Sequence, residues 1–215
     1  MDKNLFIIDY ETTGLNPYHH EVIEVAIKKY GSENNYSRLI KPTYDGYTYK
    51  YIPKKINEIT GITDGDIETQ GIEPGEAIYE TLKYIEDNSV DGPIYLIAHN
   101  GVTFDFIFFR RALREYNKEG VKTRRKSLNM EVVDRIRYID TLLLAKVLIK
   151  DERLSQSNLC KKYGIKNMAE HRSLGDILAL ERIYTIICQQ VSYLHKYDKD
   201  YYINNPEKVV DITLL

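Results

Sequence analysis

Hydrophobic positions near the start of the chain come in short runs separated by glycine and proline. The run "NLFIID" ends in acids, "EVIEVAIKKY" partly alternates, and "SRLIKP" follows, with Gly14, Pro17, Gly31 and Pro42 as punctuation. Alternation with a period of two is typical of half-buried strands, and glycine and proline mark turns. The pattern predicts three early strands.

The stretch after Pro42 changes character. Residues 43–51 are rich in tyrosine and glycine and read as a loop. A short helix, a further loop and a helix opened by Pro74 are expected next, because Ile78, Leu82 and Ile85 recur at helical intervals.

The rest of the chain alternates between strand and helix. The expected elements are a strand over 93–100, a helix over 104–116 with Thr103 as cap, a strand ending at Asp140, a helix capped by Asp140 or Thr141, a short helix between Ser155 and Gly164, and a long helix from near Ser173 into the 190s. This order predicts an α/β fold with a mixed central β-sheet flanked by helices, formed by one domain over residues 1–192. Residues 193–215 are polar and read as a C-terminal tail.

Composition narrows the class of protein only slightly. A net charge of −2 over 215 residues shows no overall basic excess, so any site for a polyanion must be local. Cys160 and Cys188 lack metal-binding spacing, which favours a reduced, intracellular chain. Neither a signal peptide nor a membrane-spanning run is evident, and we expect a soluble protein without membrane contact.

The first candidate chemistry is a pair of acids at the exit of the first strand. Asp9 and Glu11 lie two residues apart, so a strand sends both carboxylates to one face, where they repel each other. A shared hard cation such as Mg²⁺ would relieve that repulsion. A solvated strand end that happens to carry two acids is the alternative.

Two later segments offer more groups of the same kind. Asp105 stands in the first turn of a helix, and His171 precedes a helix whose first turns contain Asp176. Each has an ordinary alternative, a helix-start acid or a surface histidine. Taken together, four acids at the ends of elements and one histidine match two-metal phosphodiester hydrolysis, with the histidine accepting a proton from water.

These segments resemble the DEDDh exonucleases, the DnaQ-like 3′–5′ exonuclease superfamily, over roughly residues 6–179. The three motifs of that family, Asp-x-Glu-Thr-Thr-Gly, a His-Asn pair followed by an acid, and His-x₄-Asp, stand here at residues 9–14, at His99, Asn100 and Asp105, and at His171 to Asp176. The spacing within "HNGVTFDF", together with "HRSLGDILAL", looks closest to the three-prime repair exonuclease (TREX) branch.

The resemblance implies a ribonuclease H-like fold and a set of roles. Asp9, Glu11, Asp105 and Asp176 would bind two Mg²⁺ or Mn²⁺ ions, and His171 would be the general base that distinguishes this branch from the one using tyrosine. Asp140 is expected to be a structural helix cap and is left out of the metal site.

The same resemblance implies contacts with substrate. Thr12, Thr13 and the backbone of Gly14 would meet the sugar of the 3′-terminal nucleotide, and Leu15 would pack on its base; simple packing of Leu15 in the core is the alternative. His99 and Asn100 of the second motif are assigned to the same binding site.

A basic stretch offers contacts for the strand. Positive side chains are densest at Lys118, Lys122, Arg124, Arg125 and Lys126, and we expect the last three to contact phosphates. A solvated loop without a partner is the alternative.

We therefore expect a metal-dependent 3′–5′ exonuclease that releases nucleoside 5′-monophosphates from single-stranded or frayed DNA 3′ ends. An RNA or oligoribonucleotide exonuclease would use the same site. A proofreading subunit of a polymerase is a further alternative, with the C-terminal tail as its dock. A module that binds nucleic acid without cleaving it is disfavoured, because every catalytic position is filled.

Overall fold

The computed structural model describes residues 3–44, 47–48, 51–123, 127–150, 153–167 and 171–213. The expected phosphate contacts Arg124, Arg125 and Lys126 lie outside the described residues, as do the side chains of Lys118 and Lys122.

Five strands form the central sheet in the order β3-β2-β1-β6-β7. They are β1 (Leu5–Thr12), β2 (Val22–Lys29), β3 (Asn35–Leu39), β6 (Ile94–Ala98) and β7 (Ile136–Asp140). The first three pair antiparallel, whereas β6 runs parallel to both β1 and β7. The predicted mixed sheet and its three early strands are confirmed.

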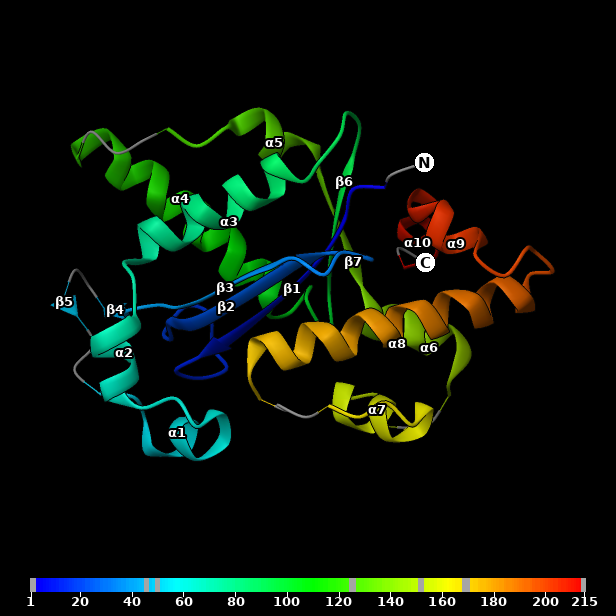
Figure 1. Ribbon diagram of the computed structural model, residues 1–215, viewed down its shortest axis with the longest axis horizontal. Helices are drawn as coiled ribbons and strands as arrows, with labels where there is room; N and C mark the ends of the chain where they lie inside the picture. Colours follow the sequence, from blue (N-terminus) through cyan, green and yellow to red (C-terminus); the bar gives the residue numbers. More distant parts are fainter. Residues whose placement is uncertain are drawn as a thin grey trace.

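The period of two along β1 divides the core into two layers. Leu5 and Ile7 point into one buried cluster, while Phe6 and Ile8 point into another on the opposite face. Figure 1 shows the helices that cover each face, with α3 and α4 on one side and α8 running across the other. The covering helices are α3 (Pro74–Asp87), α4 (Asp105–Thr123) and α5 (Met130–Arg135) on the first face and α6 (Thr141–Leu148), α7 (Gln156–Tyr163) and α8 (Ser173–Leu194) on the second.

Several predicted helix ends are confirmed by their capping contacts. Asp140 accepts a hydrogen bond from the backbone of Leu142 at the start of α6, and Ser155 caps α7 in the same way. Gly164 ends α7 in a left-handed conformation, with φ at 65°. The long helix begins at Ser173, as its apolar spacing indicates.

The expected short helix is confirmed as α1 (Lys54–Thr60), but the loop expected between it and the helix opened by Pro74 is wrong. A second short helix, α2 (Asp64–Gln70), occupies that region. Thr63 and Asp66 form a reciprocal capping box, in which each side chain accepts a hydrogen bond from the backbone of the other residue. Short strands β4 (Thr43–Tyr44) and β5 (Tyr47–Thr48) also stand within the expected tyrosine-rich loop.

The segment after α8 also differs from the expected polar tail. It contains α9 (Tyr201–Asn204) and α10 (Pro206–Thr213), which pack against α8 and β7 (Figure 1). Tyr202 and Val209 are buried in the same cluster as the face covered by α8. Polar residues dominate this segment, yet a few spaced apolar ones suffice to dock it.

None of the helices in the described part of the chain has the length and apolar character that crossing a membrane requires.

Candidate active site

The carboxylates of Asp9 and Glu11 point to the face of the sheet that α8 covers. They share the parity of Leu5 and Ile7 along β1, and those side chains lie in the cluster against α8. The parallel pairing of β1 with β6 brings the carboxyl ends of both strands to one edge. Because α4 begins shortly after β6, Asp105 reaches this edge as well.

Helix α8 brings the third acid of the cluster. One carboxylate oxygen each from Asp9, Glu11 and Asp176 lies within 4.8 Å of the others, and all three side chains are partly exposed. Three hard oxygen donors from two elements suit Mg²⁺ or Mn²⁺, which need few protein ligands because they keep waters and substrate oxygens. The chemistry of the donor set therefore fits the expected metal site.

The electrostatics of the cluster also favour a cation. Burial raises the pKa of Asp9 well above its usual value, and the charges of Asp105 and Asp176 raise it further. Burial and the charge of Asp176 raise the pKa of Glu11 to about 8. Burial likewise raises the pKa of Asp105 to about 7 and raises that of Asp176. A divalent ion would supply the positive charge that holds these groups ionised.

Asp105 is close to the triplet but is not one of its three members. It is buried, and its Oδ1 accepts a hydrogen bond from the backbone N–H of Tyr10 at 3.2 Å. The bond ties the start of α4 to the strand between the two acids of β1. Asp105 thus acts on Asp9 through its charge and holds α4 against β1.

The carboxylate of Asp176 is held by three donors. Its Oδ1 accepts from the side-chain amides of Asn167 at 2.7 Å and Gln156 at 3.0 Å, and its Oδ2 accepts from the backbone N–H of His171 at 3.0 Å. These bonds fix the rotamer of a candidate metal ligand. Asn167 and Gln156 are site residues that the motifs did not reveal, since neither lies within the His-x₄-Asp spacing.

His171 adopts a left-handed backbone conformation beside Asp176. Its φ is 64°, which is uncommon for a residue other than glycine, and its side chain is exposed. The charge of the imidazole helps to lower the pKa of Asp176, although burial raises that pKa overall. The structure thus brings the expected histidine to the acid cluster with its ring open to solvent.

The residue after His171 anchors this corner of the site. Arg172 donates from both Nε and Nη2 to the carboxylate of Glu24, at 2.6 Å for the shortest bond, and the backbone N–H of Ser173 donates to the same carboxylate at 2.9 Å. Glu24 is almost fully buried on β2. Its charge within the apolar run "VIEVAI" was the sequence signal that could have identified it.

The "TTGL" turn after β1 is held by internal hydrogen bonds. Thr12 Oγ1 donates to the carbonyl of Gly14 at 2.7 Å, and Thr13 Oγ1 accepts from the backbone N–H of Glu21 at 3.0 Å. A Cβ on Gly14 would come within 2.5 Å of the His20 ring, so a larger residue here would have to displace that ring. Both threonine hydroxyls therefore shape the turn from inside.

Leu15 stands at the tip of this turn with 84% of its side chain exposed. The alternative that Leu15 packs in the core is wrong. A large apolar side chain held in solvent beside the acids is available to a base.

The other two expected substrate contacts precede Asp105 in the second motif. Both ring nitrogens of His99 are engaged within the protein, with Thr141 Oγ1 and with the carbonyl of Leu154. Asn100 is exposed with φ at 61°, and its backbone N–H donates to Asp140 at 3.0 Å. The ring of His99 is therefore held within the protein, whereas the side chain of Asn100 lies at the surface.

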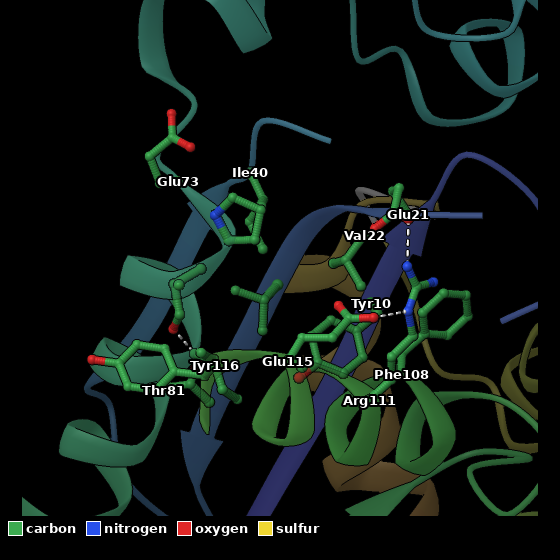
Figure 2. Close-up of a pocket in the computed structure, with 16 residues that line it drawn as sticks. Tyr10, Glu21, Val22, Ile40, Glu73, Thr81, Phe108, Arg111, Glu115 and Tyr116 are labelled. Carbon is green, nitrogen blue, oxygen red and sulfur yellow. Dashed lines mark hydrogen bonds and ion pairs between the residues drawn. The ribbon is translucent and has the colours of Figure 1, made fainter. Parts of the chain in front are cut away.

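Arg111 on α4 fastens the turn from the opposite face. Its guanidinium donates to the carbonyls of Pro17 and His20 and forms an ion pair with Glu21 at 2.5 Å. Figure 2 shows the contact with Glu21 at the edge of a cavity of about 440 Å³, which Tyr10 also lines. Tyr10 has the opposite parity to Asp9 and Glu11, so this cavity lies across the sheet from the acids.

A ribonuclease H-like sheet whose edge gathers carboxylates beside an exposed imidazole defines a class of protein, the metal-dependent hydrolases of phosphodiester bonds. The sequence pattern of the exonuclease family (RNase_T) matches residues 6–184, so the chain belongs to that family. Its motifs and relatives place it in the DEDDh, DnaQ-like superfamily.

DNA polymerase III proteins are among the relatives of this chain. The PolC-type polymerase of Thermotoga maritima is 33% identical over 187 residues, which is 85% of this chain but only 12% of that protein. The epsilon subunit of Aquifex aeolicus is 27% identical over 210 residues, covering 97% of this chain and 92% of the subunit. The expected closeness to the TREX branch stays a prediction.

Solved structures of similar fold contain nucleic acid. Exonuclease I of E. coli in complex with a dT13 oligonucleotide matches with a TM-score of 0.70 at 16% identity, over 90% of this chain and 43% of that one. Exonuclease X in complex with 5′ overhanging duplex DNA matches with a TM-score of 0.59 at 21% identity, over 97% and 99% of the two chains. These similarities confirm the fold.

Proposed function

We propose that this exonuclease removes the 3′-terminal nucleotide from DNA strands, one nucleoside 5′-monophosphate at a time, and that it proofreads for a DNA polymerase. The observation that carries the chemistry is the convergence of Asp9, Glu11 and Asp176 within 4.8 Å. The proofreading role is supported by the names of its relatives, which are polymerase III epsilon subunits and PolC-type polymerases.

Asp9, Glu11 and Asp176, with Asp105 nearby, are the residues that would hold two Mg²⁺ or Mn²⁺ ions. When bound, such ions lower the pKa of the attacking water and offset the charge that develops on the leaving 3′-oxygen. The protein contributes by keeping the carboxylates in place. Asn167 and Gln156 orient Asp176, and the Tyr10 backbone orients Asp105.

His171 is the proposed general base. An imidazole can both accept and release a proton, so an exposed ring beside the acids suits the transfer of a proton from the attacking water to solvent. The hydrogen bond from its backbone to Asp176 and the anchored Arg172 fix the position of the ring.

The turn after β1 is the proposed holder of the terminal nucleotide. Leu15 offers an apolar surface for the base, and the turn is too rigid to move aside, because Thr12, Thr13 and Arg111 hold it. The backbone near Gly14 and the side chain of Asn100 are left to meet the sugar and phosphate. Recognition of this kind needs no base edges and therefore suits trimming of any sequence.

A direct test uses 5′-labelled oligonucleotides of the same sequence in DNA and RNA form. With Mg²⁺ we expect stepwise shortening of the DNA from its 3′ end, and faster removal of a mismatched than of a paired terminus. Asp9→Ala and His171→Ala should each lose most of the activity while keeping the thermal unfolding transition. Cleavage undiminished in both variants would reject the site, and preference for the RNA strand would replace DNA proofreading with RNA turnover.

The polymerase partner needs its own measurement. We expect the protein to copurify with a replicative polymerase and to raise the fidelity of primer extension. Unchanged fidelity in the presence of the active exonuclease would reject the proofreading role and leave the hydrolytic activity in place.

A further inference from the structure

A second groove lies between the first half of α8 and the β2–β3 edge of the sheet, and we call it the α8 groove. Its volume is about 520 Å³. The residues that line it include Lys166, Asn167, Arg172, Leu174, Leu178 and Arg182. None of them belongs to the acid triplet, and none was assigned to substrate from the motifs.

The α8 groove carries an excess of positive charge. Within the part of the chain that the structure describes, neither Lys166 nor Arg182 forms an ion pair, and both side chains are exposed. The third cation, Arg172, is offset by Glu24, whose hydrogen bond raises the pKa of the guanidinium, and more weakly by Asp66. Two cations that form no ion pair with a described residue therefore face the solvent in the groove.

The floor between these cations is apolar. Leu174 is half-buried, and Leu178 is 45% exposed one turn further along α8. An aliphatic strip flanked by cations is suited to a ligand that alternates flat apolar rings with negative groups. A single nucleic acid strand has this character, since its bases stack or pack on side chains while its phosphates meet lysine and arginine.

The α8 groove adjoins the acid cluster through two of its lining residues. Asn167 lines the groove and donates to Asp176 at 2.7 Å. Glu24, at the other side, pairs directly with Glu11 across β1 and β2. A strand whose terminal phosphodiester lies at the acids would reach the groove without leaving the protein surface.

We propose that the α8 groove binds the nucleotides on the 5′ side of the one being removed, with Lys166 and Arg182 contacting their phosphates. The inference rests on the proposed function, because it needs a 3′ terminus at Asp9 and Glu11. The turn at Leu15 is assigned to the terminal nucleotide, so the remaining strand must leave past another element, and the α8 groove offers the complementary charge.

The test compares Lys166→Ala/Arg182→Ala with the charge-matched control Lys146→Ala/Lys199→Ala. Lys146 and Lys199 are exposed and lie outside the groove. Binding of a fluorescein-labelled dT oligonucleotide in EDTA is followed by anisotropy at several salt concentrations. Loss of two phosphate contacts should weaken binding about tenfold and lower the salt slope by about 1.4, whereas the control should change neither substantially.

A second readout separates the groove from the chemistry. The p-nitrophenyl ester of thymidine 5′-monophosphate engages the terminal site without any upstream strand. We expect the groove variant to hydrolyse this ester at the unmodified rate with Mg²⁺, and to show a raised KM on a dT20 strand.

Equal affinity and salt slope in the groove variant and the control would overturn the proposal, and would leave the groove to some partner other than a nucleic acid strand. Equal loss of ester and strand hydrolysis would also overturn it, because the two cations would then act on the reacting site. Failure of the unmodified protein on the ester and the strand alike would instead reject the proposed function, while the anisotropy in EDTA still decides strand binding.

Discussion

Two glutamates that face each other across neighbouring strands have opposite surroundings. Glu24 is buried on β2, and its carboxylate oxygens accept hydrogen bonds from Arg172 and from the backbone N–H of Ser173. Glu11 pairs with it from β1 and lies among carboxylates, with Arg172 as only a weak counter-charge, so that burial and Asp176 raise its pKa to about 8.

The protein itself supplies the positive charge that balances Glu24, and it leaves the charge that would balance Glu11 to a ligand. The guanidinium of Arg172 compensates Glu24, which therefore serves the fold and the placement of His171. The acids around Glu11 receive no comparable cation among the described residues, and their raised pKa values fit the proposed metal site. The Glu24–Arg172 ion pair and the acid cluster lie on the same face of the sheet, but only the ion pair has its negative charge balanced.

The largest expected effect is a loss of activity when one of the acids around Glu11 is replaced. Asp9→Asn keeps the shape of the side chain but removes a charged donor from the triplet. Because loss of an outer-shell partner costs about 10–100-fold, loss of a direct ligand should lower kcat/KM by more than about a hundredfold. Steady-state hydrolysis of a dT20 strand with Mg²⁺ measures this, and a loss of less than about tenfold would remove Asp9 from the metal site.

The next effect is on stability and depends on pH. An acid whose pKa is raised on folding binds its proton more tightly in the folded state, so stability falls as pH rises between the ordinary pKa and the raised one. For Glu11 and Asp105 that window runs from about 4.5 to about 8 and from about 4 to about 7.

In EDTA we therefore expect the free energy of unfolding to fall by about 2 kcal/mol between pH 5 and pH 8, after allowance for solvent screening of the partly exposed acids. Adding Mg²⁺ at pH 8 should restore it. Urea denaturation at both pH values measures the change, and a metal-free protein more stable at pH 8 would contradict the charge deficit.

The smallest expected effect is on the free energy of unfolding, which should change in opposite directions when each of the two glutamates is replaced. In EDTA at pH 8, Glu11→Gln should raise the free energy of unfolding by about 1 kcal/mol, because it removes repulsion. Glu24→Gln should lower it by about 1–2 kcal/mol, because it weakens the charged hydrogen bonds to Arg172. Changes of the same sign in the two variants would show that the glutamates do not differ as described.

Much of the architecture could be predicted from local patterns. The three early strands, the caps at Asp140 and Ser155 and the start of α8 followed from spacing and capping chemistry, which act over a few residues. Helix α2 was missed, although its capping box is visible in the sequence at Thr63 and Asp66. The docking of the last helices was missed because it depends on Tyr202 and Val209 finding a distant apolar surface.

Motifs in the sequence are sufficient to identify the candidate metal ligands and the candidate general base. These are the acids Asp9, Glu11, Asp105 and Asp176, and the histidine at position 171. The tertiary structure decided how they are used. It placed three carboxylates in one triplet with Asp105 beside it, gave Glu24 a guanidinium, exposed Leu15 and opened a basic groove along α8. The physical reason is that burial and pairing of charge depend on residues far apart in the chain, which meet only when the sheet and its helices pack.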